Sequence, residues 1–138
     1  MVGLVVATHG KLGDELLATV GSVCGPLERA RAVSISSAQP MEEARESLAA
    51  AIRDMDDGDG VLVVTDMFGG TPANLALTFL DARIEVVTGV NLPMLLKLST
   101  ARAGGATLAA TAEMLAGYGQ KNITLVSQLL RDRVQKGR

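Results

Sequence analysis

The hydrophobic pattern along this chain switches between two periods. Short runs that are apolar at nearly every position alternate with longer stretches in which apolar residues recur every three or four positions. The runs are typical of strands buried on both faces of a sheet, and the longer spacing is that of helices with one buried face. The pattern predicts strands at Val2–Ala7, Ala32–Ile35, Val61–Thr65, Ile84–Thr88 and Ile123–Val126.

Helices are predicted in the intervals, and turn residues mark their ends. Thr71 resembles an N-cap followed by Pro72 in the first helical position, and Asn91 resembles the N-cap of the next helix. The dipeptides Gly25-Pro26 and Gly104-Gly105 interrupt the helical pattern. The expected helices span about residues 12–23, 40–55, 72–80, 91–102 and 108–119.

Strands that alternate with helices predict βαβ units and therefore an α/β fold with a mostly parallel sheet. Right-handed crossovers bring the carboxyl ends of parallel strands to one rim, where the ligand chemistry of such sheets collects. The residues that follow each strand are therefore the candidates for function. His9 follows the first predicted strand, and Asp66 follows the third.

Length and composition narrow the possible functions. The 138 residues fit one domain, and 13 basic against 15 acidic side chains give a formal net charge of −2. With two Phe, one Tyr and no Trp, neither a basic nor an aromatic surface for nucleic acid is expected. The chain has no apolar stretch of membrane-spanning length, and its first residues lack the basic region of a signal peptide. A cytoplasmic protein is expected.

The chain has one cysteine and one histidine. Cys24 cannot form an intrachain disulfide, and we expect it to be a small core residue. His9 has no second His or Cys ligand on the rim, so no metal site is expected. A hydrolase that combines His9 and Asp66 with Ser36 or Ser37 is one alternative, although neither serine lies in a nucleophile-elbow pattern. The favoured role for the imidazole is that of a nucleophile that forms a phosphohistidine.

The residues around Asp66 suit that chemistry. A carboxylate that accepts one imidazole N–H fixes the tautomer, and it offsets the positive charge that develops when the ring is phosphorylated. Gly69 and Gly70 leave backbone N–H groups accessible, and a helix beginning near Thr71 would direct its positive end at a phosphoryl group. No Walker motif is present, so a nucleotide is not implied. Phe68 either packs beneath its loop or offers a contact surface to a partner protein.

Three motifs together resemble a known family. They are Thr8-His9-Gly10 after the first strand, the segment from Thr65 to Asn74 after the third, and the segment from Gly89 to Met94 after the fourth. In order and spacing they are similar to the mannose-type enzyme IIA components of the phosphoenolpyruvate:sugar phosphotransferase system. The resemblance covers a domain of residues 1–126 and leaves a basic tail, residues 127–138, outside it.

The resemblance implies a mechanism and a set of partners. The residue matching His9 receives a phosphoryl group from the phosphorylated histidine-containing phosphocarrier protein and passes it to a IIB domain, and the residue matching Asp66 orients the ring. No cofactor is implied, and the membrane is reached only through IIC and IID components. The implied sheet order is 2-1-3-4, with Ile123–Val126 as a fifth, antiparallel strand exchanged between the subunits of a homodimer.

Sequence reasoning leaves two further points open. The chain is either a phosphoryl carrier in sugar uptake or a reporter of phosphorylation state that acts by binding a kinase or a transcription regulator. Neither the sugar nor the role of the tail can be inferred from these residues.

Overall fold

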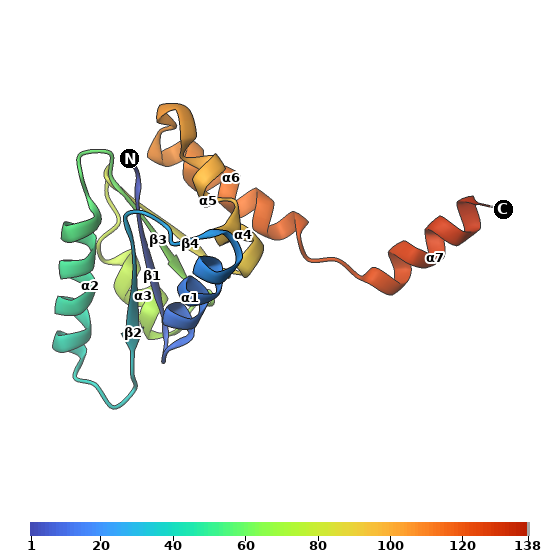
Figure 1. The fold of residues 1–138 in the computed structure, drawn as a ribbon. Coiled ribbons are helices and arrows are strands. Elements are labelled where there is room, and N and C mark those ends of the chain that lie inside the picture. The colour runs from blue at the N-terminus through green and yellow to red at the C-terminus, as the bar shows by residue number, and fades with distance from the viewer. Residues whose placement is uncertain (138) are drawn as a thin grey trace.

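A computed structural model describes residues 1–137 of the chain. Its centre is a parallel four-stranded sheet in the order β2-β1-β3-β4 (Figure 1). The strands are β1 (Gly3–His9), β2 (Ala30–Ile35), β3 (Val61–Thr65) and β4 (Ile84–Thr88). The α/β class and the strand order predicted from the sequence are confirmed.

Helices cover both faces of this sheet. On one face lie α2 (Met41–Met55) and α3 (Gly70–Leu77); on the other lie α1 (Leu12–Cys24), α4 (Leu92–Leu96), α5 (Leu98–Ala101) and α6 (Leu108–Lys121). A hydrophobic core lies on each face of the sheet. Successive side chains of a buried strand pack alternately into these two cores, because they point to opposite faces. Val5 and Val63 pack toward α2 and α3, whereas Leu4 and Leu62 pack toward the second group. This explains why the central strands are apolar throughout.

The helix that follows β3 begins earlier than predicted. Thr71 is not its N-cap and Pro72 is not its first residue, since α3 starts at Gly70 with Gly69 as the cap. Both glycines have positive φ, at 87° and 80°, a conformation that lets the chain turn directly into the helix. Among residues 1–137 no side chain caps this helix, so its first N–H groups are left for another acceptor.

Other helix boundaries also differ from the prediction. Asn91 is an N-cap as expected, with its side-chain oxygen 3.0 Å from the Met94 nitrogen, but the single expected helix is divided into α4 and α5. A 3₁₀ turn at Ala103–Gly105 follows, where Gly104-Gly105 was expected to interrupt the helix. Helix α6 continues through Gly119, which is buried beside Met94. Cys24 is exposed at the end of α1 rather than part of the core.

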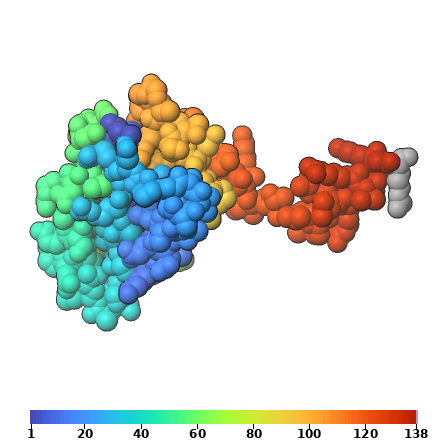
Figure 2. Space-filling model, viewed as in Figure 1, coloured from blue at the N-terminus to red at the C-terminus, as the bar shows by residue number. Residues whose placement is uncertain are grey.

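The C-terminal segment leaves the body of the molecule. Residues 123–125 form no strand within the described chain, and helix α7 (Val126–Lys136) stands apart from the rest (Figures 1 and 2). Ile123 and Leu125 are 80% and 69% exposed. Strand exchange needs a second chain, so the fifth strand stays a prediction. Among residues 1–137 no helix combines the length and apolar character needed to cross a membrane.

Candidate functional site

His9 and Asp66 meet at the carboxyl rim of the sheet. His9 is the last residue of β1 and Asp66 follows β3, its neighbour in the sheet, so the topology brings residues 57 positions apart together. Asp66 Oδ2 lies 2.9 Å from the ring Nδ1 and also accepts the backbone N–H of His9 at 3.1 Å. The imidazole is half-exposed and the carboxylate largely buried. Both the main chain and the ring of His9 are therefore held by one oxygen.

This contact sets the chemistry of the imidazole. A carboxylate only accepts hydrogen bonds, so Nδ1 carries the proton and Nε2 carries the lone pair. The second oxygen, Oδ1, is buried and has no hydrogen-bond partner among the described residues. The arrangement fixes the ring and leaves Nε2 as the free nucleophilic atom.

Gly70 lies directly against the free edge of the ring. A Cβ placed on Gly70 would be 2.9 Å from Cε1 and 3.1 Å from Nε2 of His9. Only glycine permits this approach, because a side chain would occupy the space in front of Nε2. The first turn of α3, which contains Gly70 and Thr71, thus starts beside the nucleophilic edge. Uncapped N–H groups at a helix N-terminus are suited to hold an anion there.

Phe68 stands out from the loop between Asp66 and α3. Its side chain is 82% exposed, and that of the neighbouring Met67 is 53% exposed. The interpretation of Phe68 as a residue packed beneath the loop is therefore wrong. Two exposed apolar side chains in the loop that joins Asp66 to α3 fit contact with another protein.

The serines after β2 make no site with His9. The Ser36 hydroxyl accepts the N–H of Ala38 at 3.2 Å, within its own turn. In the part of the chain that the structure describes, neither Ser36 nor Ser37 is hydrogen-bonded to the imidazole. The geometry needed for a serine hydrolase is not assembled.

Sequence reasoning missed Ser34. The hydroxyl of this β2 residue donates to the carbonyl of Gly10, directly after His9, with an O···O distance of 2.6 Å. Ser34 lies within the strand rather than after it, so a search restricted to the residues following each strand passes over it. The signal that could have found it is a polar residue between two apolar ones, Val33 and Ile35, near the carboxyl end of the strand.

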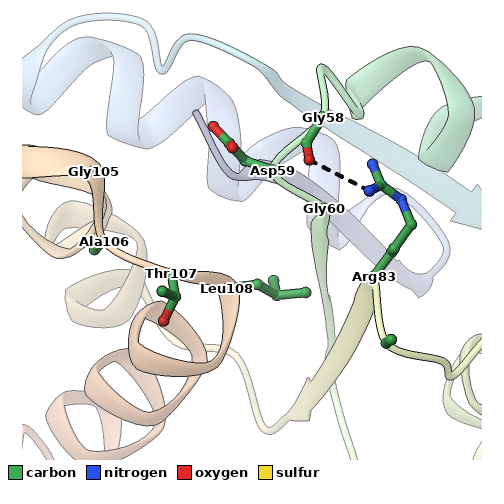
Figure 3. Close-up of a pocket in the computed structure, with 9 residues that line it drawn as sticks. Gly58, Asp59, Gly60, Arg83, Gly105, Ala106, Thr107 and Leu108 are labelled. Atoms are coloured by element: carbon green, nitrogen blue, oxygen red, sulfur yellow. Dashed lines mark hydrogen bonds between the residues drawn. The ribbon is translucent and has the colours of Figure 1, made fainter.

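A hollow of about 330 Å³ lies at the amino end of the sheet, away from His9. Figure 3 shows it between the turn at Gly58–Gly60, Arg83 and the start of α6 at Thr107 and Leu108. The guanidinium of Arg83 is bound by both oxygens of Asp56, at 2.7 and 2.6 Å. The cation beside this hollow is therefore already neutralised.

Comparison with protein families identifies one match over most of the chain. Residues 3–116 match a family described as the PTS system fructose IIA component. The fructose-specific EIIA component of Bacillus subtilis (strain 168) is 31% identical over 104 residues, which cover 74% of this chain and 71% of that protein. The mannose-specific EIIAB component of Escherichia coli (strain K12) is also 31% identical, over 73% of this chain, and the match spans 32% of that longer protein.

Solved structures show the same fold. A PTS IIA protein associated with the fucose utilization operon of Streptococcus pneumoniae superposes with a TM-score of 0.81 at 27% identity, covering 94% of this chain and 99% of that one. The mannose/sorbose-specific IIA subunit from Enterococcus faecalis gives a TM-score of 0.78 at 28% identity, covering 89% and 92%. The EIIA component from Streptococcus agalactiae has a TM-score of 0.82 at 23% identity, covering 93% and 99%, a likeness of fold.

Proposed function

The chain belongs to the mannose-type IIA family of the sugar phosphotransferase system, and we propose that it carries a phosphoryl group on His9. The donor is the phosphorylated histidine-containing phosphocarrier protein, and the acceptor is a histidine of a IIB domain. The observation that carries the proposal is the ring of His9, fixed at Nδ1 by Asp66 with Nε2 free beside Gly70. The membrane is involved only through IIC and IID components further along the relay.

The first transfer forms one bond and breaks one bond. The lone pair of His9 Nε2 attacks the phosphorus of the donor phosphohistidine, and the bond from phosphorus to the donor's imidazole nitrogen breaks with its electron pair returning to that ring. The positive charge that develops on His9 is offset by Asp66, 2.9 Å from Nδ1. The second transfer repeats the step with His9 as the leaving group.

Backbone groups stabilise the phosphoryl oxygens in this mechanism. The N–H groups at Gly69, Gly70 and Thr71 lie at the positive end of α3, and the Thr71 hydroxyl is a further donor. Transfer of a phosphoryl group depends mainly on alignment and charge stabilisation, so these donors and the fixed imidazole are sufficient protein groups.

Partner docking is assigned to the exposed surface around Phe68. A carrier must bind two different proteins in turn and release each of them, which favours small, weak interfaces. An exposed aromatic side chain beside the reactive ring supplies apolar contact area and excludes water during transfer.

We also infer a homodimer built by exchange of Ile123–Val126. Strand β4 pairs on one side only, with β3, so its outer edge is open within the described chain. The apolar residues Ile123 and Leu125 are exposed beyond the end of α6. Removing every residue after Gly119 should then lower stability and yield a monomer with an exposed edge. An equally stable, monodisperse truncated monomer, alongside a full chain that is also monomeric, would contradict the exchange.

Phosphorylation in a reconstituted relay tests the function. Incubation with phosphoenolpyruvate, enzyme I and the phosphocarrier should add one acid-labile phosphoryl group, detected by intact-protein mass spectrometry. His9→Ala should fold and remain unlabelled. Wild-type protein that gains no phosphoryl group, or a His9→Ala variant that gains one, would overturn the proposal. Subsequent loss of the label to a IIB protein distinguishes a carrier from a reporter of phosphorylation state.

A further inference from the structure

We propose that Ser34 is a positioning residue that aims the His9 imidazole by fixing the carbonyl of Gly10; this rests on the proposed function. Ser34 does not reach the imidazole by a hydrogen bond of its own. It acts on the peptide bond between Gly10 and Lys11, and through the backbone of Gly10 on the direction in which the His9 ring leaves the strand.

Both backbone polar groups of Gly10 are hydrogen-bonded to β2. Its N–H donates to the carbonyl of Ile35 at 3.0 Å, and its carbonyl accepts the Ser34 hydroxyl at 2.6 Å. Gly10 has a φ of 54°, the left-handed conformation that ends β1 and turns the chain into α1. The two hydrogen bonds together select this conformation, because they hold the two peptide units on either side of the Gly10 Cα.

The residue before His9 is held as well, by α1. Thr8 is fully buried, and its hydroxyl oxygen accepts the N–H of Gly13 at 2.8 Å. A Cβ on Gly13 would lie 2.9 Å from the carbonyl oxygen of Val6, so the first turn of α1 presses closely on the end of β1. The Thr8 hydroxyl lies 3.4 Å from the Gly10 carbonyl, a much longer contact than that of Ser34.

His9 is thus clamped from both neighbouring strands. On the β3 side, Asp66 holds the main-chain N–H and Nδ1 of His9, and on the β2 side, Ser34 holds the peptide that follows Gly10. A ring that is fixed at Nδ1 alone can still swing about that contact. Fixing the main chain on the second side limits the swing and holds Nε2 in line with the space beside Gly70.

The location of the bond argues for positioning rather than for fold stability. Ser34 and Gly10 are both exposed, so water can replace the lost donor if the hydroxyl is removed. Ser34→Ala should therefore fold with an almost unchanged melting temperature. The cost should appear in the geometry of His9, because water does not hold the Gly10 carbonyl in one direction.

The test is the rate of His9 phosphorylation by the phosphorylated phosphocarrier, measured over a range of carrier concentrations. Ser34→Ala should lower kcat about tenfold, since errors of a fraction of an ångström in alignment have effects of this order, and leave KM unchanged. Ser34→Thr keeps the hydroxyl and should restore kcat. Ser36→Ala is the matched control: its hydroxyl bonds within its own turn, and the rate should equal that of wild type.

A spectroscopic readout separates positioning from a general structural role. In wild type, the Nδ1 proton of His9 should exchange slowly with water and give a sharp NMR signal because Asp66 holds it. In Ser34→Ala this proton should exchange faster, while amide signals of the sheet core stay unchanged. Equal kcat and equal Nδ1 proton exchange in wild type and Ser34→Ala would overturn the assignment, as would a loss that Ser34→Thr does not restore. Absence of labelling in wild type would instead overturn the proposed function.

Discussion

Each end of the sheet holds an aspartate paired with a basic side chain, but the two pairs are built differently. At the amino end, both oxygens of Asp56 bind Arg83, and Asp56 Oδ1 also accepts the N–H groups of Gly58 and Gly60. At the carboxyl rim, Asp66 uses a single oxygen on His9, and its other oxygen has no partner among the described residues. Both oxygens of Asp56 are therefore hydrogen-bonded, whereas only one oxygen of Asp66 is.

The difference separates a structural pair from a reactive one. The pair at the amino end closes a turn, and both oxygens of its carboxylate are hydrogen-bonded. The pair at the rim leaves Nε2 of His9 free, with Gly70 rather than a side chain in front of it. A charged pair is thus evidence for function only when one partner keeps an accessible reactive atom.

The largest expected effect comes from filling the space before Nε2. Gly70→Ala places a Cβ 2.9 Å from Cε1 of His9 and strains a residue with a φ of 80°. Because His9 or α3 must shift, we expect phosphoryl transfer to fall by more than about a hundredfold. Gly89→Ala is the matched control, since Gly89 has a φ of 83° and nothing within 4 Å of its added Cβ. Rates that fall equally in both variants would show that backbone strain, not obstruction, is responsible.

Loss of the rim carboxylate should have the next largest effect. Asp66→Ala removes the acceptor for Nδ1–H and allows the other tautomer, whose Nε2 carries the proton and cannot attack. Phosphoryl transfer to His9 should slow by about ten- to a hundredfold in a folded protein, measured by rapid-quench labelling. An unchanged rate would mean that Asp66 is only a turn residue.

Truncating the exposed aromatic should affect docking alone. Phe68→Ala should raise KM for the phosphocarrier several-fold and leave kcat and the melting temperature unchanged, because an 82% exposed side chain contributes little to folding. Val23→Ala, which shortens a side chain 62% exposed at the far end of α1, should change neither constant. A KM unaffected by Phe68→Ala would exclude this residue from the interface.

The smallest effect is expected at the pair of Asp56 and Arg83. The hydrogen bond from Arg83, followed by that from the Gly58 N–H, lowers the pKa of Asp56 below its ordinary value. A carboxylate whose pKa is lower in the folded than in the unfolded state stabilises the protein, and this stabilisation is fully present above about pH 4. The stabilisation is lost as the pH falls through the folded-state pKa. Arg83→Met should therefore destabilise the protein by at most about 1 kcal/mol at neutral pH.

Denaturant unfolding of wild type and Arg83→Met at several pH values measures this effect on stability. The stability difference between wild type and Arg83→Met should shrink as the pH falls below about 4 and vanish once Asp56 is protonated in the folded wild type as well. Phosphoryl transfer should be unaffected. A difference that stays constant with pH, or a variant with slower transfer, would remove the distinction between the two ends of the sheet.

The sheet and the location of the site follow from the sequence for simple reasons. The central strands β1 and β3 are buried on both faces, so successive residues in them have to be apolar. Along the chain, a helix separates each strand from the next. Parallel topology then places the carboxyl end of β1, which His9 occupies, beside the residue that follows β3. His9 and Asp66 could be predicted together on that basis.

Details that depend on backbone torsions could not be predicted in the same way. Sequence preferences favour Thr71 as an N-cap, but the positive φ of Gly69 and Gly70 starts α3 earlier. The clamp by Ser34 depends on the direction of one carbonyl, which no residue pattern specifies. Cys24 is a small apolar residue at a helix end, and whether it is covered depends on the path of the following chain.

The site of phosphorylation on the ring tests the central claim most directly. Nitrogen NMR of ¹⁵N-labelled protein after phosphorylation distinguishes a phosphoryl group on Nε2 from one on Nδ1. The account predicts phosphorylation at Nε2, with the proton retained on Nδ1 beside Asp66. A phosphoryl group on Nδ1 would require the contact with Asp66 to break, and it would contradict the assignment of the carboxylate as the group that selects the reactive nitrogen.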